Sequence, residues 1–235
     1  MPSPATTPSS TVEDYVKCIY EKQLRSEREF VPTGQVAAAM EVAPGTATTM
    51  VKTLADAGLL THEPYTGVRL TSEGVKLAKH VLRRHRVVEL FLVEIMGMDW
   101  SEVHTDAELL EHAVSDRLIE RMDEMLGGPK VDPHGDPIPT ATGTSDETDY
   151  PNLLNCALDA DLTVVRVLDQ RSVFLRLLET SGLTPGSQLV VDSRNEEADS
   201  VLIRPSTGKG LSLGFRAASK VLVRQTKEEP AESSR

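Results

Sequence analysis

Residues 33–58 restrict the fold more than any other segment, because they have the pattern of two short helices joined by a tight turn. Apolar residues recur at helical spacing in the first helix, up to Met40. Pro44 stands where proline is favoured, at the first turn of a helix, and Gly58 is a typical helix stop. Two helices joined in this way, the second beginning with small polar residues, predict a helix-turn-helix.

A β-hairpin is predicted directly after these two helices. The runs 59–63 and 68–70 have the alternation of strands, and the turn residues 65–67 separate them. Such a hairpin would be the wing of a winged helix, so this segment is expected to bind DNA, with Arg69 in the wing near phosphate. The candidate residues facing the major groove are Gly45, Thr46, Thr48, Thr49 and Lys52. A solvated helix face is the alternative explanation for the threonines.

Longer helices are predicted on both sides of this segment. Ser10 and Glu13 have the spacing of a capping box at the start of a helix over 11–24. Thr71 can cap a second helix that runs to about residue 96, with apolar residues on one side. This long helix would connect the winged segment to a helical dimerisation domain.

Six potential metal ligands stand at helix-compatible spacings between residues 85 and 112. They are His85, Glu89, His104, Glu108, Glu111 and His112. The last three are three and four residues apart, so on one helix their side chains can converge on a single ion. The alternative is that Glu108 serves only to complete a capping box with Thr105. A divalent-metal site is the leading hypothesis.

The net charge of -11 is distributed unevenly along the chain. Residues 1–86 hold 11 Lys and Arg against 9 Asp and Glu, residues 87–155 hold 3 against 16, and residues 156–235 hold 11 against 11. The acidic residues are therefore concentrated around the candidate ligands, where they favour cation binding, while the first third is mildly basic. Nonspecific affinity for DNA should be modest.

Other sequence features limit the class of protein. A run of about 18 apolar residues is absent, and the first ten residues lack the basic and apolar regions of a signal peptide, so a cytoplasmic protein without membrane contact is expected. Cys18 and Cys156 are far apart and form no CxxC pair. Neither a disulfide framework nor a thiolate zinc site is indicated.

Several motifs together resemble the diphtheria-toxin-repressor family of metal-dependent transcriptional regulators. They are Glu13-Asp14-Tyr15, Leu70-Thr71-Ser72-Glu73-Gly74, Arg84-His85-Arg86 with Glu89, Val103-His104, Glu111-His112-Ala113-Val114-Ser115, and Asp132-Pro133-His134-Gly135-Asp136-Pro137-Ile138-Pro139. The resemblance extends over nearly the whole chain. It implies a homodimeric repressor in which bound metal fixes two winged helices at the spacing of operator DNA.

The resemblance also implies which residues bind the metal. Manganese-responsive members have aspartate and glutamate at the positions of Asp14 and Glu108, where iron-responsive members have methionine and cysteine. The implied primary ligands are Asp14, Glu108, Glu111 and His112. This all-hard set suits Mn(II), with Fe(II) as the competitor and Co(II) or Zn(II) able to bind in vitro.

A second metal site is implied in the same way. His85, Glu89 and His104 correspond to an ancillary site of the family. Asp132 and His134 resemble positions that bind a further metal in some full-length manganese regulators, with a solvated loop as the alternative.

The predicted fold is mainly α with a small β part. A disordered tail over 1–10 precedes a winged helix-turn-helix domain over 11–74 and a metal-binding and dimerisation domain over 75–140. A linker over 141–157, a domain over 158–226 and a second disordered tail over 227–235 follow. Short alternating strands in 158–226 are similar to the FeoA-type, SH3-like β-barrel that ends many long family members.

Three other functions are weighed against a manganese-dependent repressor. The first alternative is an iron-dependent repressor of the same family. A winged-helix regulator of an organic ligand and a metal-dependent hydrolase are less favoured. Carboxylate and histidine clusters also build hydrolytic and di-iron sites, but the ferritin-like pattern needs two Glu-x-x-His motifs, and residues 108–112 have the wrong offset. An enzyme is therefore not expected.

Overall fold

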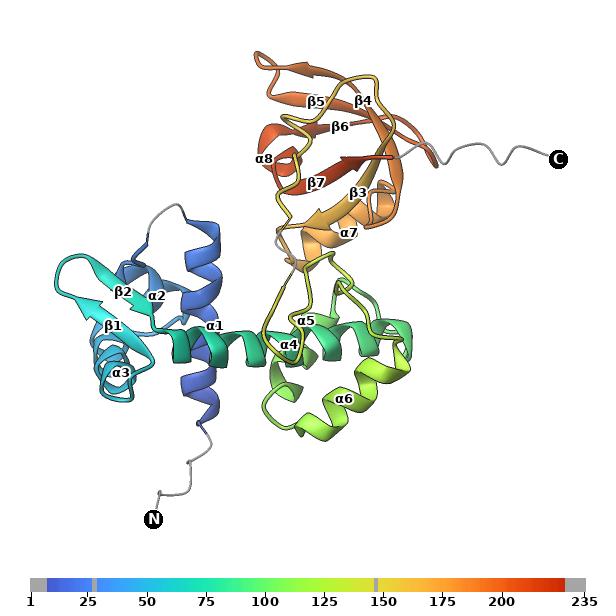
Figure 1. The fold of residues 1–235 in the computed structure, drawn as a ribbon. Helices are drawn as coiled ribbons and strands as arrows, with labels where there is room; N and C mark the ends of the chain where they lie inside the picture. Colours follow the sequence, from blue (N-terminus) through green and yellow to red (C-terminus); the bar gives the residue numbers. More distant parts are fainter. Residues whose placement is uncertain (1–7, 27–28, 146–147, 227–235) are drawn as a thin grey trace. The chain divides into compact units, whose positions relative to one another are not determined.

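The computed structural model describes residues 8–26, 29–145 and 148–226 and divides into two compact units (Figure 1). The first unit comprises Met1–His85, Leu110–Asp116 and Pro139–Ser145, and the second comprises Arg86–Leu109, Arg117–Ile138 and Asp146–Arg235. Most of the predicted tails, namely 1–7 and 227–235, lies outside the described residues. None of the described helices is long and apolar enough to cross a membrane.

The first unit contains the predicted winged helix-turn-helix. Its elements are α1 (Ser10–Arg25), α2 (Thr33–Ala39), α3 (Pro44–Asp56), β1 (Leu60–Glu63) and β2 (Gly67–Leu70). The capping box predicted at Ser10 is wrong. The cap is Ser9, whose hydroxyl accepts a hydrogen bond from the backbone N of Val12 at 3.4 Å, because the helix begins one residue earlier than expected.

The wing is fixed to the core of this unit along β2. β1 and β2 pair antiparallel, and Val31 extends the pairing through two backbone hydrogen bonds with Val68, each 2.9 Å. Leu60, Val68 and Leu70 point into the core formed with α1 and α3. β1, by contrast, is exposed from Thr61 onward, and so is the turn 64–66.

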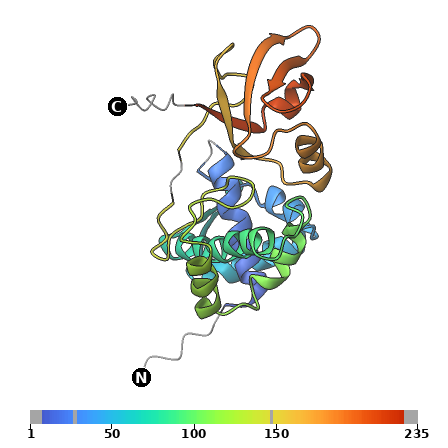
Figure 2. The ribbon, with the colours of Figure 1, turned by 90° about the vertical axis from the view of Figure 1, so that its right-hand side faces the viewer.

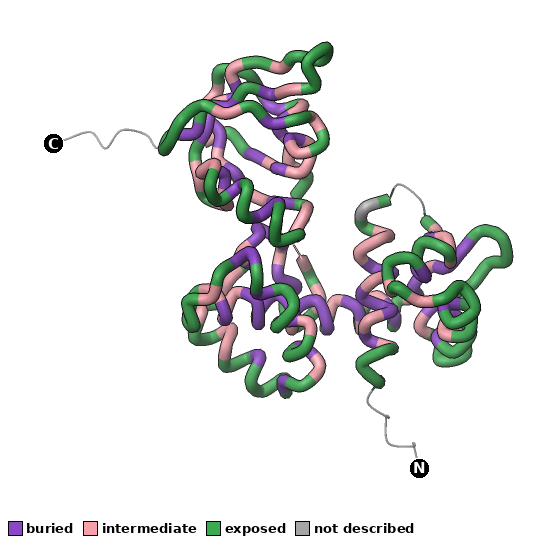
Figure 3. The backbone as a smooth tube through the Cα atoms, turned by 180° about the vertical axis from the view of Figure 1, so that it is seen from behind, coloured by how far each residue is buried: buried purple, intermediate pink, exposed green. Residues whose placement is uncertain are grey.

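α4 (Ser72–Glu94) is the long helix predicted from the sequence. Thr71 caps it as expected, since its hydroxyl accepts a hydrogen bond from the backbone N of Gly74 at 3.2 Å. The central residues of α4 are almost all buried (Figure 3). Gly97, at φ 70°, follows in the left-handed region that glycine adopts easily after a helix.

Two shorter helices, α5 (Val103–Leu110) and α6 (Asp116–Met125), follow α4. The capping box predicted at Thr105 is wrong, because α5 begins earlier, after a turn in which Asp99 accepts a hydrogen bond from the backbone N of Ser101 at 2.7 Å. The prediction that Glu111 and His112 lie on a helix with Glu108 is also wrong. They follow α5 in a tight turn, where the N–H groups of the next two residues both bond to the carbonyl of Leu110.

The second unit contains a five-stranded antiparallel sheet in the order β6-β5-β4-β3-β7 (Figure 1, Figure 2). The strands are β3 (Leu162–Val167), β4 (Gln188–Asn195), β5 (Ser200–Pro205), β6 (Leu211–Gly214) and β7 (Val221–Gln225), with helices α7 (Ser172–Thr180) and α8 (Phe215–Ala218). The sequence did not predict β6, which has four residues. Trp100, from the segment before α5, packs into the core of this sheet.

The Pro/Gly-rich segment 131–138 forms an ordered loop against β3. Asp132 Oδ1 accepts hydrogen bonds from the backbone N of His134 at 2.8 Å and of Asp136 at 2.9 Å. Gly135 has a φ of 86°, and a Cβ there would lie 2.0 Å from the carbonyl oxygen of Val165, so glycine is required. This loop carries two of the predicted metal ligands.

Candidate metal centres

The first cluster joins residues nearly one hundred positions apart in the first unit. Asp14 lies on α1, whereas Glu111 and His112 follow α5, and their ligand atoms all lie within 4.8 Å of one another. His112 Nε2 is 2.8 Å from Asp14 Oδ1 and 3.4 Å from Glu111 Oε1. Two carboxylates and an imidazole at such distances can bind one divalent ion without large movements.

Three further side chains surround this cluster. Lys17 Nζ donates to both oxygens of the fully buried Glu111, at 2.6 and 2.9 Å, and His85 Nδ1 is 2.5 Å from Glu111 Oε2. Glu13 Oε2 is 2.6 Å from His112 Nδ1 and can hold the ring so that Nε2 faces Asp14. Lys17 and Glu13 were not predicted in these roles from the sequence. The spacing of Lys17 from Asp14, three residues along one helix, was the available signal.

The ionisation of the cluster depends on burial and on its neighbours. Burial raises the pKa of Asp14, although His112 partly opposes this. Burial lowers the pKa of His112, but the hydrogen bond to Glu13 and the charges of Glu111 and Asp14 outweigh it, so the pKa is raised. A metal ion would therefore compete with a proton for the His112 ring.

The second cluster lies in the second unit and is fully buried. It consists of Glu89 on α4 and of Asp132 and His134 in the loop 131–138, with ligand atoms all within 4.8 Å of one another. Glu89 and His134 have no exposed side-chain surface and Asp132 has 1%. Buried carboxylates in this number need a compensating cation or proton.

The hydrogen bonds of His134 indicate which species this second cluster could hold. His134 Nε2 is 2.9 Å from the carbonyl oxygen of Trp100, which can only accept, so Nε2 carries a proton. In the neutral ring, Nδ1 then presents a lone pair to Glu89 Oε2 at 3.7 Å and Asp132 Oδ1 at 4.0 Å. Among the described residues, neither His134 Nδ1 nor Asp132 Oδ2 has a hydrogen-bond partner. A cation between them would satisfy all three side chains.

The carboxyl group of Asp132 is difficult to ionise, although Arg86 Nε lies 3.8 Å from its Oδ2 and favours the charged form. Burial, together with the charges of Asp136 and Glu89, raises the pKa of Asp132 to about 7. The pKa of His134 is also raised, because Glu89 and Asp132 outweigh the opposing effect of burial. Protons and a metal ion are thus alternative ways to neutralise the cluster near neutral pH.

The remaining predicted ligands have other contacts. His85, expected beside Glu89, contacts Glu111 in the first cluster. His104 Nδ1 is 3.1 Å from Glu89 Oε1, and His104 Nε2 is 3.7 Å from Glu108 Oε1. The structure therefore associates Glu89 with the loop 131–138 as well as with His104.

The predicted DNA-facing residues occupy α3 and the wing. The α3 candidates, Gly45, Thr46, Thr48, Thr49 and Lys52, are all exposed. The hydroxyls of Thr48 and Thr49 donate to the carbonyl oxygens of Pro44 and Gly45, at 2.9 and 3.0 Å. Arg69 of the wing forms an ion pair with Glu29 and lies 5.2 Å from the centre of the Phe30 ring.

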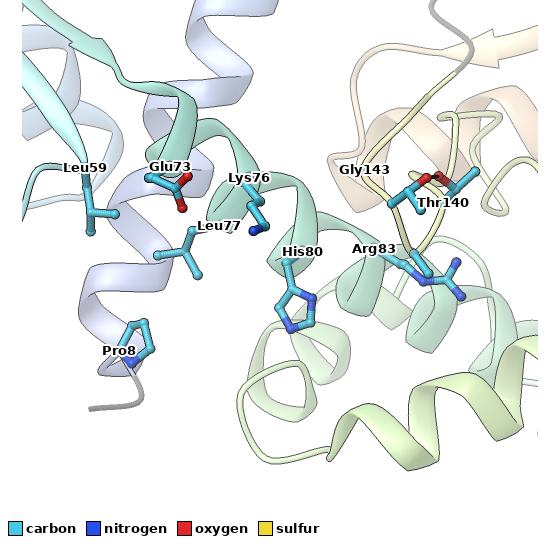
Figure 4. Close-up of a pocket in the computed structure, with 11 residues that line it drawn as sticks. Pro8, Leu59, Glu73, Lys76, Leu77, His80, Arg83, Thr140 and Gly143 are labelled. Atoms are coloured by element: carbon cyan, nitrogen blue, oxygen red, sulfur yellow. Dashed lines mark hydrogen bonds between the residues drawn. The ribbon is translucent and has the colours of Figure 1, made fainter. Parts of the chain in front are cut away.

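A cavity of about 430 Å³ also lies in the first unit, beside α4 (Figure 4). Lys76, His80 and Arg83 lie along one side of the helix, facing the loop that carries Thr140 and Gly143. None of the described lining residues belongs to either ligand cluster, so the cavity is separate from both candidate metal centres.

The combination of a winged helix-turn-helix with clusters of metal ligands defines a metal-responsive DNA-binding regulator. Three family models match successive segments: "Iron dependent repressor, N-terminal DNA binding domain" over 8–68, "Iron dependent repressor, metal binding and dimerisation domain" over 71–140, and "FeoA domain" over 152–225. The chain belongs to the iron-dependent repressor family. This family consists of transcriptional repressors rather than enzymes.

Individual relatives agree with this assignment. The HTH-type transcriptional regulator MntR of Bacillus subtilis is 36% identical over 121 residues, which are 52% of this chain and 82% of that protein. A solved structure described as a manganese-dependent transcriptional repressor in complex with manganese has a TM-score of 0.83 at 37% identity, covering 92% of this chain and all of that chain. The structure of ScaR with bound Zn2+ has a TM-score of 0.77 at 31% identity, covering 93% of this chain and all of that chain.

Proposed function

We propose that this chain is a manganese-responsive repressor whose first metal centre, formed by Asp14, Glu111 and His112, controls binding to operator DNA. Glu108 remains a predicted fourth ligand. The observation that carries the proposal is that a ligand on α1 of the winged helix-turn-helix meets two ligands from the segment after α5. A metal ion there would fix α1 in one position relative to this segment and so favour one arrangement of the DNA-binding elements.

The choice of Mn(II) is supported by the chemistry of the ligands. Both clusters offer carboxylate oxygens and imidazole nitrogens and no sulfur, which suits Mn(II) and Fe(II) better than soft-ligand metals. Several relatives are described as manganese-dependent or manganese-activated. Fe(II) remains the competing physiological metal, and Zn(II) and Co(II) are expected to bind in vitro.

We further propose that Glu89, Asp132 and His134 bind a second metal ion with a structural role. Support comes from the complete burial of Glu89 and His134 and from the short distances of His134 Nδ1 to Glu89 Oε2 and Asp132 Oδ1, 3.7 and 4.0 Å. A metal at this position would hold the loop 131–138 to α4, so it would raise the stability of the second unit.

The proposed repressor acts as a homodimer on double-stranded DNA. Large apolar side chains are exposed on α5 and α6, including Leu109 at 71%, Leu118 at 52% and Met125 at 51%. These residues lie in the segment that matches a dimerisation domain, and a second copy of the chain would cover them.

The decisive test is a DNA-binding titration with Mn(II), Fe(II), Co(II) and Zn(II) at matched free-metal concentrations. The expected result is that Mn(II) activates binding to a duplex that the wild-type protein has selected from a random pool. Replacing His112 by Ala should abolish activation, whereas replacing His80 by Ala, outside both clusters, should leave it unchanged.

Two results of this titration would contradict the proposal. DNA binding that is unaffected by chelation of all metals would show that no metal controls the protein. Full activation by Mn(II) in the His112→Ala variant would show that the first cluster is not the controlling centre.

A further inference from the structure

The tip of the wing carries an aromatic side chain in an unusual backbone conformation. Tyr65 has a φ of 66°, a region that bulky residues rarely adopt. Its side chain is completely exposed, with a relative accessibility of 109%, the largest among the described large hydrophobic residues that are exposed. Burial in the protein core does not stabilise this ring, and the backbone conformation at Tyr65 is unfavourable. A contact of the ring with another molecule would explain why a tyrosine stands at this position.

The local geometry explains where the strain comes from. The backbone carbonyl oxygen of Glu63 accepts a hydrogen bond from the backbone N of Thr66 at 3.1 Å. This bond closes a four-residue turn with Pro64 and Tyr65 at its centre. Proline followed by a residue with positive φ is the pattern of a type II turn, in which glycine or asparagine is favoured at the position of Tyr65. The sequence therefore places a large ring where the backbone favours a small residue.

The backbone directly after the turn is fixed to the rest of the unit. Gly67 packs so closely on the backbone that a Cβ would lie 2.3 Å from the carbonyl oxygen of Val31. The bonds between Val31 and Val68 fix the same end of the hairpin. α3 and β1 are in contact, so the wing has a fixed place beside the predicted recognition helix (Figure 1).

Several other polar side chains of this module already have partners within the chain. The hydroxyl protons of Thr48, Thr49 and Thr53 are donated to carbonyl oxygens of α3 itself. Arg69, the cation of the wing, is engaged by Glu29 and Phe30. The exposed side chains of α3 and the wing that carry other donors are Thr46, Lys52, His62, Tyr65 and Thr66, and Tyr65 is the aromatic one with a large apolar surface.

We propose that Tyr65 is a DNA contact of the wing, with its ring packed on the sugar edges of the minor groove and its hydroxyl donating to an acceptor there. Every base pair presents acceptors in the minor groove, and amphipathic aromatic rings suit such partly wet surfaces. The neighbouring Glu63 is acidic, so the contact depends on the neutral ring and not on phosphate neutralisation. The inference rests on the proposed DNA-binding function.

The test compares Tyr65→Asn, Tyr65→Ala and Tyr65→Phe with the wild type, by fluorescence anisotropy on the selected duplex at saturating Mn(II). Tyr65→Asn and Tyr65→Ala should weaken binding by about three- to tenfold, the range expected for one aromatic contact. Tyr65→Phe, which keeps the ring and loses only the hydroxyl, should lose about two- to fivefold and bind more tightly than Tyr65→Ala. The unfolding temperature of Tyr65→Asn should not fall, because asparagine tolerates positive φ.

Salt dependence separates this contact from an electrostatic one. Removing a neutral side chain should leave the slope of log affinity against log salt unchanged, whereas Lys52→Ala should reduce the slope by about one. The proposal is overturned if Tyr65→Asn and Tyr65→Ala bind as tightly as the wild type. A wild-type protein without metal-dependent binding would instead contradict the proposed function itself.

Discussion

Lys17 places an ammonium group beside the proposed ligands of the first metal centre. Its ammonium group donates to both oxygens of Glu111, and the side chains are 9% and 0% exposed. Glu111 therefore has a cationic partner before any metal arrives. The ammonium group of Lys17 already neutralises part of the negative charge of this site. This favours the binding of a single divalent ion over the binding of an ion with a higher charge.

Removing this cation should destabilise the metal-free protein. Lys17→Ala leaves the Glu111 carboxylate buried without its ammonium partner, which typically costs about 3 kcal/mol. We expect the unfolding temperature without metal to fall and Mn(II) to restore more stability than in the wild type. Lys22→Ala, on the same helix, is the control, because it removes one positive charge without removing the partner of Glu111. An unchanged unfolding temperature in Lys17→Ala would show that the ion pair contributes little.

Proton competition at His112 should make Mn(II) binding depend on pH. The pKa of His112 is raised above 6.5, so in the metal-free protein the protonated ring contributes stability below pH 6.5, which is lost as the pH rises through the folded pKa. Mn(II) affinity should change in the opposite sense, rising as the pH increases through that range. Calorimetry in buffers of different ionisation enthalpy should detect protons released on binding. A constant affinity between pH 6 and 8, roughly the range in which histidine titrates, would contradict this account.

At the level of secondary structure, the loop 131–138 depends on its contact with β3. Val167 donates its backbone N–H to the carbonyl of His134 at 2.8 Å, next to the close approach of Gly135 to Val165. Arg166 and Gln170 both hold the carboxylate of Asp136. The C-terminal sheet therefore determines where two ligands of the second cluster lie.

Gly135→Ala should disrupt the second centre. The new methyl group would meet the Val165 carbonyl, and φ is already positive, so a loss of about 2 kcal/mol or more is expected. Metal analysis should find one bound ion fewer per chain than in the wild type. Gly128 also has a positive φ, 69°, but a Cβ added there would have no atom within 4 Å. Gly128→Ala therefore shows the effect of backbone strain without a steric clash. Equal behaviour of the two variants would rule out the steric explanation.

Elements that depend on local signals were predicted correctly from the sequence, whereas elements that depend on distant contacts were not. Periodicity and turn residues predicted the winged helix-turn-helix, because its elements depend on local signals such as Pro44 and Thr71. The start of α5 depends on the turn at Asp99, and its end on backbone bonds to Leu110, which spacing alone does not indicate. The grouping of Glu89 with the loop 131–138 depends on distant packing against β3. Asp14, Glu111 and His112 were grouped correctly, whereas Asp132 and His134 were named without Glu89 as their partner.

For the whole molecule, the exposed apolar residues of α5 and α6 make a prediction about assembly. Leu118→Asp should shift the protein from dimer to monomer in sedimentation experiments, because a buried charge in an apolar interface is costly. Leu202→Asp, on β5, changes a side chain of similar exposure, 45% against 52%, and should leave the dimer intact. A Leu118→Asp variant that stays dimeric would place the interface elsewhere.

We propose that metal binding and DNA binding are coupled through Asp14, the ligand that α1 provides. By thermodynamic linkage, DNA must raise Mn(II) affinity by the same factor by which Mn(II) raises DNA affinity. The most direct measurement is therefore the Mn(II) affinity of the protein with and without the selected duplex, for the wild type and for Asp14→Asn. We predict an increase of about 5- to 150-fold for the wild type, the range typical of such coupling, and a much smaller increase for Asp14→Asn. Equal Mn(II) affinities with and without DNA in the wild type would contradict the account.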